Sequence, residues 1–239
     1  MAPHGKISKP RKMNRWTLFL PCAAACLSLA SAGEVVVGAK VMPQRYVVSE
    51  GSMSPDGKFA MIHRQLIFPQ DEKVDALRLK NYLVRLEPFE VLAENFGQPY
   101  FNPGNHRSMA VEWSGDGTAL LFLVGGKWGT IGATLFELRE GKVARRADLL
   151  AKIHSELKPL FTKAKVRPYN DHVEFVISDQ DEWKIGADGH GLEVNVTVST
   201  APNLAPGRAF EGKFTGSWSI PGGKWLSRKA SGHAVASKR

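Results

Sequence analysis

The chain twice places a short turn directly before an apolar strand. Residues 54–57 read Ser-Pro-Asp-Gly and residues 114–117 read Ser-Gly-Asp-Gly, and apolar runs follow at 59–62 and 119–122. An aspartate in such a turn accepts hydrogen bonds from nearby backbone N–H groups, and glycine adopts a positive φ without steric cost. Each pattern therefore predicts a β-hairpin corner that leads into a buried strand.

Further strands are predicted after each of these corners. Residues 82–86 and 134–138 both carry leucine at their second and fifth positions, and each leads to another predicted strand, at 91–92 and 142–143. The shared spacing indicates a recurring unit of antiparallel strands. Two ordinary hairpins that happen to share a turn sequence are the alternative.

A weaker third copy begins near Trp183. Asp188-Gly189 precedes residues 192–198, which alternate apolar and polar side chains with the period of two that is typical of a half-buried strand. Strands are also predicted at 173–177 and 210–220. The C-terminal part of the chain is therefore expected to be rich in β-structure.

One segment predicts an amphipathic helix. Asp148 is a suitable N-cap, and Pro159 is expected to end or kink the helix. The apolar side chains on one face of this helix are Leu149, Leu150, Ile153 and Leu157.

These patterns predict a mainly β fold, with blade-like antiparallel β-meanders, one amphipathic helix and a β-rich C-terminal part. The β repeats occupy residues 33–147, and the helix and C-terminal strands occupy residues 148–226. Residues 200–207 are rich in proline, alanine and asparagine, which predicts a loop. Residues 227–239 are small, polar and basic, and the prediction for them is a disordered tail.

The turn at 54–58, Ser-Pro-Asp-Gly-Lys, resembles the WD40-like PD40 repeat of TolB-type β-propellers. The copy at 114–117 departs from that pattern because it lacks the proline. The resemblance covers about residues 44–147 and implies blade-like β-meanders. Two or three copies are too few to close a ring, which takes at least about four blades. An open arrangement of blade-like sheets is therefore expected.

The N-terminal segment 1–32 has the features of a secretory signal peptide. A basic stretch precedes an apolar run at 16–29, which is shorter than the ~20 residues of a membrane span. Ala30-Ser31-Ala32 follows and predicts cleavage before Gly33; Met13 is an alternative start. The protein is therefore expected to be periplasmic or extracellular, with no transmembrane segment in the mature chain.

Cysteine and charge both concentrate outside the central part of the chain. Cys22 and Cys26 lie within the predicted leader, so the mature chain is expected to contain no disulfide and no thiol nucleophile. The formal net charge of +9 comes from basic residues in segments 1–32 and 224–239, neither of which contains an acid. The intervening residues are nearly neutral, which argues against a nucleic-acid-binding protein.

Motifs of known catalytic chemistry are incomplete. Neither 51–54 nor 216–219 completes the Gly-x-Ser-x-Gly elbow of an α/β-hydrolase, and 125–127 lacks the remaining residues of a P-loop. No pair of histidines has the spacing of metal ligands, and His154 is interpreted as a residue flanking the apolar helix face. The acidic run at 179–182 does not match a calcium loop. No catalytic residue, metal or cofactor is therefore assigned.

Tryptophan residues follow two Gly-Gly turns. Gly-Gly-Lys-Trp occurs at 125–128 and 222–225. Trp128 and Trp225 are expected either to cover the end of the core or to stack on a ligand, and Trp113 and Trp183 are expected to be buried.

The function predicted from these features is that of an exported, non-catalytic binding or scaffold protein of the cell envelope, whose partner is a protein or another envelope component. The alternative is an envelope-acting hydrolase with carboxylates that converge from separate loops. His106, Asp116 and Trp128 flank the turns of the second unit and are the candidate ligand-binding residues.

Overall fold

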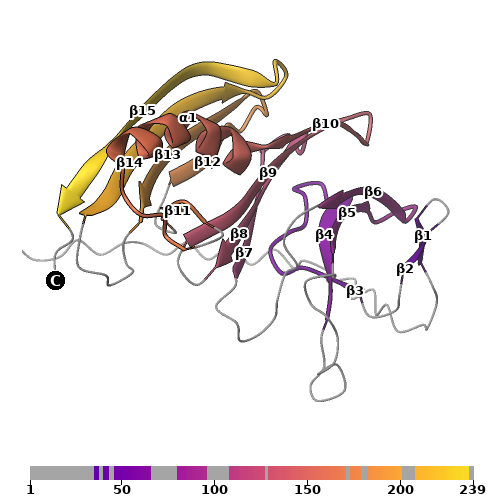
Figure 1. Ribbon diagram of the computed structural model, residues 1–239. Helices are drawn as coiled ribbons and strands as arrows, with labels where there is room; N and C mark the ends of the chain where they lie inside the picture. The colour runs from indigo at the N-terminus through magenta and orange to yellow at the C-terminus, as the bar shows by residue number, and fades with distance from the viewer. Residues whose placement is uncertain are drawn as a thin grey trace, which may run out of the picture. The chain divides into compact units, whose positions relative to one another are not determined.

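The computed structural model describes residues 35–37, 40–42, 46–65, 80–95, 108–126, 129–170, 173–178, 182–200 and 208–236. Within these residues the protein is mainly β with one helix, α1 (Leu149–Ala164), as predicted. The antiparallel strands form sheets of two, four and nine strands and do not close a propeller ring (Figure 1). The strands are β1 (Val35–Val37), β2 (Lys40–Met42), β3 (Tyr46–Val48), β4 (Phe59–Arg64), β5 (Asn81–Arg85), β6 (Glu90–Asn95), β7 (Ser108–Trp113), β8 (Ala119–Gly126), β9 (Gly129–Arg139), β10 (Lys142–Asp148), β11 (Val176–Ile177), β12 (Glu182–Ile185), β13 (Gly191–Ser199), β14 (Arg208–Ser219) and β15 (Lys224–Ala236).

Three four-stranded meanders follow one another along the chain. The first is β3-β4-β5-β6, the second β7-β8-β9-β10 and the third β12-β13-β14-β15, and every neighbouring pair is antiparallel. The short strand β11 pairs with both β9 and β13, so the second and third meanders share one nine-stranded sheet. The segment expected to hold a weaker third copy is thus also a four-stranded meander.

The first two corners share two of the hydrogen bonds that their serine hydroxyls make. Ser54 Oγ donates to Asp56 Oδ1 at 2.7 Å and accepts from the backbone N of Phe59 at 2.9 Å. Ser114 Oγ donates to Asp116 Oδ1 at 2.6 Å and accepts from the backbone N of Ala119 at 2.9 Å. The glycine that follows each aspartate has a φ of 70° or 71°. The serine hydroxyl therefore connects the aspartate to the start of the buried strand.

The third corner keeps the aspartate and the glycine but has Gly186 in place of the serine. Asp188 Oδ1 accepts from the backbone N of His190 at 3.0 Å, and Gly189 has a φ of 69°. In all three units the backbone carbonyl of the residue after the turn glycine accepts from an N–H at the end of the unit's third strand. The donors are Leu86, Leu138 and Ile220, at 2.8, 2.7 and 2.9 Å.

The aspartates of the two serine corners are expected to make the stability of the protein depend on pH. The hydrogen bond from Ser54 is the largest of the effects that hold the pKa of Asp56 below its ordinary value. Burial alone would raise the pKa of Asp116, but the bonds donated by Ser114 and Thr118 outweigh burial and lower it. Folded-state pKa values below those of the unfolded chain stabilise the protein at neutral pH, and that contribution is lost as pH falls through the folded values.

We therefore expect the melting temperature of the native chain to fall more steeply between about pH 5 and pH 2 than that of Asp116→Asn, which retains an acceptor but does not titrate. Differential scanning calorimetry across this range measures the difference. Parallel curves for the two proteins would contradict the prediction.

The largest core lies between α1 and the inner face of the nine-stranded sheet. Leu149, Ile153, Leu157 and Phe161 of the helix are buried there, each worth about 1.5–3 kcal/mol of transfer free energy. A second core joins the first two meanders, where Met61 and Leu83 pack in one cluster with Leu120. Both cores agree with the apolar positions predicted from the strand and helix patterns.

Helix α1 begins as predicted but does not end at Pro159. Asp148 is the N-cap, and its Oδ1 accepts from the backbone N of Ala151 at 2.9 Å. The helix continues to Ala164, although proline cannot donate to the carbonyl one turn earlier. Burial of Phe161, two residues after Pro159, stabilises this last part of the helix.

The prediction of a disordered tail is wrong for residues 227–236, which belong to β15. Ala230, Gly232 and Ala234 face the helix side, while Lys229, Ser231 and His233 between them are exposed. This alternation is hard to recognise because its inward side chains are so small. Their small size is needed, because a Cβ on Gly232 would lie 2.4 Å from the ring of the buried Phe210.

Other predicted segments differ in detail. Of the strand predicted at 173–177, only Val176–Ile177 pairs with neighbouring strands. Trp225 covers the core, which is one of the two roles expected for it. Its ring centroid lies 5.0 Å from that of Phe214 and 5.0 Å from that of Trp218. Trp113 and Trp183 are half-buried rather than buried. The predicted leader and most of the loop at 200–207 lie outside the described residues.

Candidate functional site

Of the three candidate residues from the sequence, only Asp116 is among the described residues; His106 and Trp128 lie outside them. Asp116 is a corner residue whose carboxylate accepts from Ser114 and from the N and Oγ1 of Thr118. Its backbone N also donates to Ala187 O at 3.1 Å, which joins the second corner to the third. These bonds give Asp116 a structural role, and a contact with ligand stays a prediction.

A cavity of about 670 Å³ lies between α1, the start of β9 and residues 169–170 and 173–177. Its walls are apolar over much of their area, and α1 contributes two of its polar side chains, His154 and Lys158. The apolar lining consists of Ile131, Leu150, Val173, Phe175, Val176 and Ile177, and the polar side chains are Thr130, His154, Lys158, Tyr169, Asn170 and Glu174. A concave, largely apolar cavity with a few convergent polar groups is typical of a small-molecule site.

One carboxylate in the cavity is shared by two nitrogen-bearing side chains. Glu174 Oε2 lies 3.2 Å from His154 Nε2, and Glu174 Oε1 lies 3.2 Å from Lys158 Nζ. His154 and Lys158 are four residues apart, so α1 presents them on the same face. The His154 ring stacks on Phe175 with centroids 4.6 Å apart and planes at 16°.

The segment that carries Glu174 is held in place by local hydrogen bonds. The N–H of Tyr169 donates to Glu174 O at 2.9 Å, and the N–H of Val173 donates to Asn170 Oδ1 at 2.8 Å. Burial raises the pKa of the Tyr169 phenol, which therefore stays neutral at physiological pH. Phe175 also contacts Phe161 of the helix, so the segment is attached to the main core.

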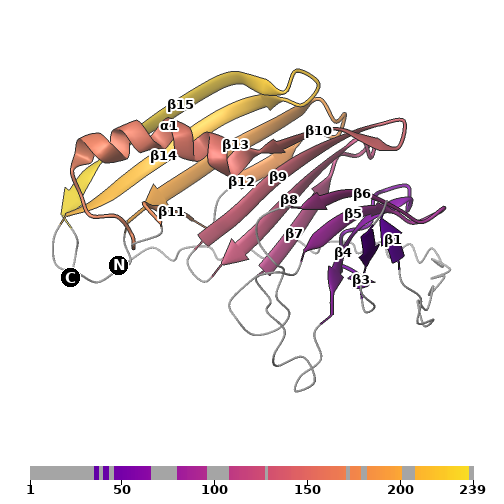
Figure 2. The same ribbon diagram turned by 45° about the vertical axis from the view of Figure 1, so that its right-hand side comes forward.

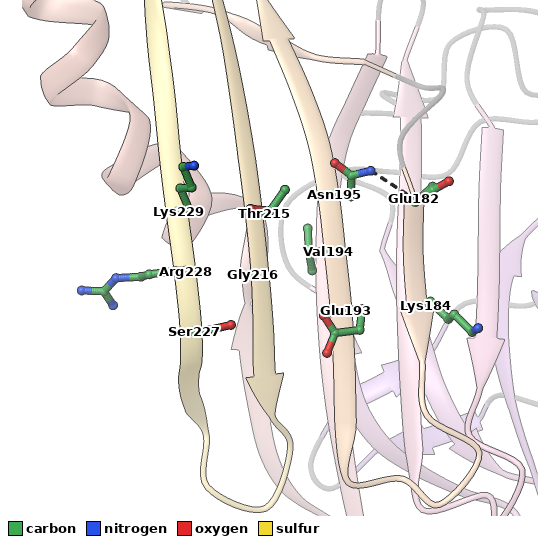
Figure 3. A pocket seen from close by; sticks show the side chains of 10 residues that line it. All are labelled: Glu182, Lys184, Glu193, Val194, Asn195, Thr215, Gly216, Ser227, Arg228 and Lys229. Atoms are coloured by element: carbon green, nitrogen blue, oxygen red, sulfur yellow. Dashed lines mark hydrogen bonds between the residues drawn. The ribbon is translucent and has the colours of Figure 1, made fainter.

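A second, smaller groove of about 470 Å³ crosses the outer face of β12–β15 (Figure 3). Asn195 Nδ2 donates to Glu182 Oε2 at 3.2 Å, and Lys184 stands opposite Glu193 in the strand register. Arg228 points away from the other lining side chains and pairs with Glu156 of α1 at 3.3 Å. No aromatic ring lines this groove, so it offers polar contacts but little apolar area.

Within the described part of the chain, no three His, Cys, Asp or Glu side chains are grouped so that they could hold a metal ion. In the same residues, no helix has the length and apolar character needed to cross a membrane. Neither known family models nor curated proteins match this chain.

The sequence analysis recognised His154 only as a flank of the apolar helix face. Its place in the cavity depends on Glu174 and Phe175, which are distant along the chain. The one local signal was the spacing of His154 and Lys158, which puts two nitrogen-bearing side chains one helical turn apart. That spacing is common on solvated helices and does not by itself indicate a site.

Proposed function

We propose that the protein is an exported, non-catalytic binding protein of the cell envelope that holds a small amphipathic ligand in the cavity beside α1. The observation that carries the proposal is the apolar cavity with Glu174, His154 and Lys158 converging on one side. The envelope location rests on the leader predicted at residues 1–32.

The cavity favours a ligand with an apolar body and one anionic end. Leu150, Phe175 and Ile177 offer apolar contact to the body. At the polar side, His154 and Lys158 share a single carboxylate, and an ammonium group has three donors. Lys158 therefore retains donors for a ligand carboxylate, sulfonate or phosphate.

The carboxylates of the cavity and the groove support a hydrolase less well than a binding protein. The cavity contains one carboxylate, Glu174, whereas acid–base hydrolysis by converging carboxylates requires two. Glu182 and Glu193 do line one groove, but this groove is an open sheet face. Binding without catalysis is therefore the better supported function.

A fluorescent probe with an aromatic body and a sulfonate, anilinonaphthalene sulfonate, tests the cavity. We expect one saturable site on the native chain and about tenfold weaker binding to Lys158→Glu, because the substitution places a second anion beside Glu174. Titration of probe fluorescence measures both dissociation constants.

Lys163→Glu is the matched control, because Lys163 lies on the same helix but does not line the cavity. Circular dichroism establishes that both variants keep the native fold. Equal losses of affinity in the two variants, or no saturable binding to the native chain, would contradict the proposal.

A further inference from the structure

Strand β15 is much longer than the strands that occupy the same place in the other two meanders. It has 13 residues, whereas β6 has 6 and β10 has 7. Among the described residues only β14 pairs with β15, and β15 is an edge strand of the nine-stranded sheet (Figure 2). Leu226 has no partner in β14, because the register shifts between Ser217 and Trp218. On either side of this irregularity, alternate backbone N–H and C=O groups of β15 face outward along the edge, which is the arrangement that accepts an added strand.

The charged side chains of β15 are all positive. Lys224, Arg228 and Lys229 are basic, and no residue from 224 to 236 is acidic. Arg228 pairs with Glu156 of α1, whereas no described acid pairs with either lysine. Leu226 lies between them in the sequence and is 66% exposed.

The second half of β15 presents little steric obstruction. Residues 230–236 read Ala-Ser-Gly-His-Ala-Val-Ala, and His233 is the largest of them. An incoming strand would therefore meet cations and an exposed leucine beside the first half, and small side chains beside the second.

Charge also decides which kind of strand fits. Basic residues on an exposed edge oppose pairing with a second copy of the same edge, because like charges would face each other across the new ladder. The same residues attract an acidic strand, since opposite charges across a ladder contribute about 0.2–1 kcal/mol per pair.

We propose that the edge of β15 that no other described strand pairs with binds an acidic, extended segment of a partner protein, which adds to the sheet as a further strand. Backbone hydrogen bonds hold the segment in place, and Lys224 and Lys229 select acidic side chains. This interaction is separate from the cavity beside α1 and does not depend on the ligand proposed for it.

A labelled peptide of about nine residues, in which glutamate alternates with valine or threonine, spans most of the edge at ~3.3 Å per residue. We expect saturable binding to the native chain by fluorescence anisotropy, and about tenfold weaker binding to the double variant Lys224→Glu/Lys229→Glu. The double variant should instead bind the peptide in which lysine replaces every glutamate. Lys142→Glu/Lys163→Glu has the same net charge and should bind like the native chain.

An acidic peptide methylated at alternate backbone nitrogens separates strand addition from simple charge attraction. Methylation removes the donors on one edge of the peptide without changing its charge, so its binding should be lost. The proposal is overturned if the methylated peptide binds as tightly as the parent, or if no acidic peptide binds saturably. It is also overturned if light scattering shows a dimer of the native chain that the double variant abolishes, since a second copy would then occupy the edge.

Discussion

Gly129→Ala is expected to lower the free energy of unfolding by about 3 kcal/mol or more. Gly129 has a φ of 152°, and a Cβ at this position would lie 1.8 Å from the carbonyl oxygen of Ile177. That oxygen belongs to β11, whose Ile177 pairs with Thr130 of β9 and with Val198 of β13. Because backbone atoms line both sides of the contact, no side-chain rotation can relieve the clash.

The measurement is urea unfolding followed by tryptophan fluorescence. Gly191→Ala is the matched control, because Gly191 begins β13 and a Cβ there would meet nothing within 4 Å. Alanine in a strand is favoured over glycine by roughly 0.5–1 kcal/mol, so the control is expected to be neutral or slightly stabilising. Similar midpoints for the two variants would mean that β9 and β11 do not approach each other as closely as described.

Gly129 also connects fold to function, because it lines the cavity beside α1. The same contact between β9 and β11 that joins two meanders into one sheet forms part of the cavity wall. Displacement of β11 would move Phe175 and Glu174, which precede it directly in the chain. We therefore attribute the shape of the site to this strand junction as well as to the helix.

Features that depend on a few neighbouring residues could be predicted from the sequence. The corners at Asp56 and Asp116 are closed by bonds that span at most five residues, and the Asp148 cap spans three. Such geometry is fixed by residue type and local spacing. The mainly β architecture and the one helix of the described residues followed from these local signals.

Features that depend on distant contacts could not be predicted in this way. The pairing of β11 with both β9 and β13 rests on two residues of strand, too short to show a pattern. Glu174 meets His154 only because the chain turns back after α1 ends. In the second half of β15 the inward positions 230, 232 and 234 are alanine and glycine, and their role becomes visible only beside the ring of Phe210.

The corner serines provide the second large effect, because each hydroxyl connects two parts of the turn. Ser114 is fully buried, and its Oγ accepts from Ala119 N while donating to Asp116 Oδ1. Ser114→Ala leaves the buried N–H with one partner fewer and removes a hydrogen bond to a carboxylate. We expect a loss of about 2 kcal/mol in the free energy of unfolding, measured by urea denaturation.

Ser155→Ala is the control, since Ser155 is an exposed helix residue whose Oγ bonds to Lys152 O at 2.7 Å. It should change stability by no more than about 0.5 kcal/mol. Ser54→Ala should resemble Ser114→Ala, because Ser54 Oγ also donates to the corner aspartate and accepts from the first N–H of the buried strand. Equal stability of Ser114→Ala and Ser155→Ala would instead mean that aspartate and glycine suffice to hold these turns, as they do in the third corner, where Gly186 stands in place of serine.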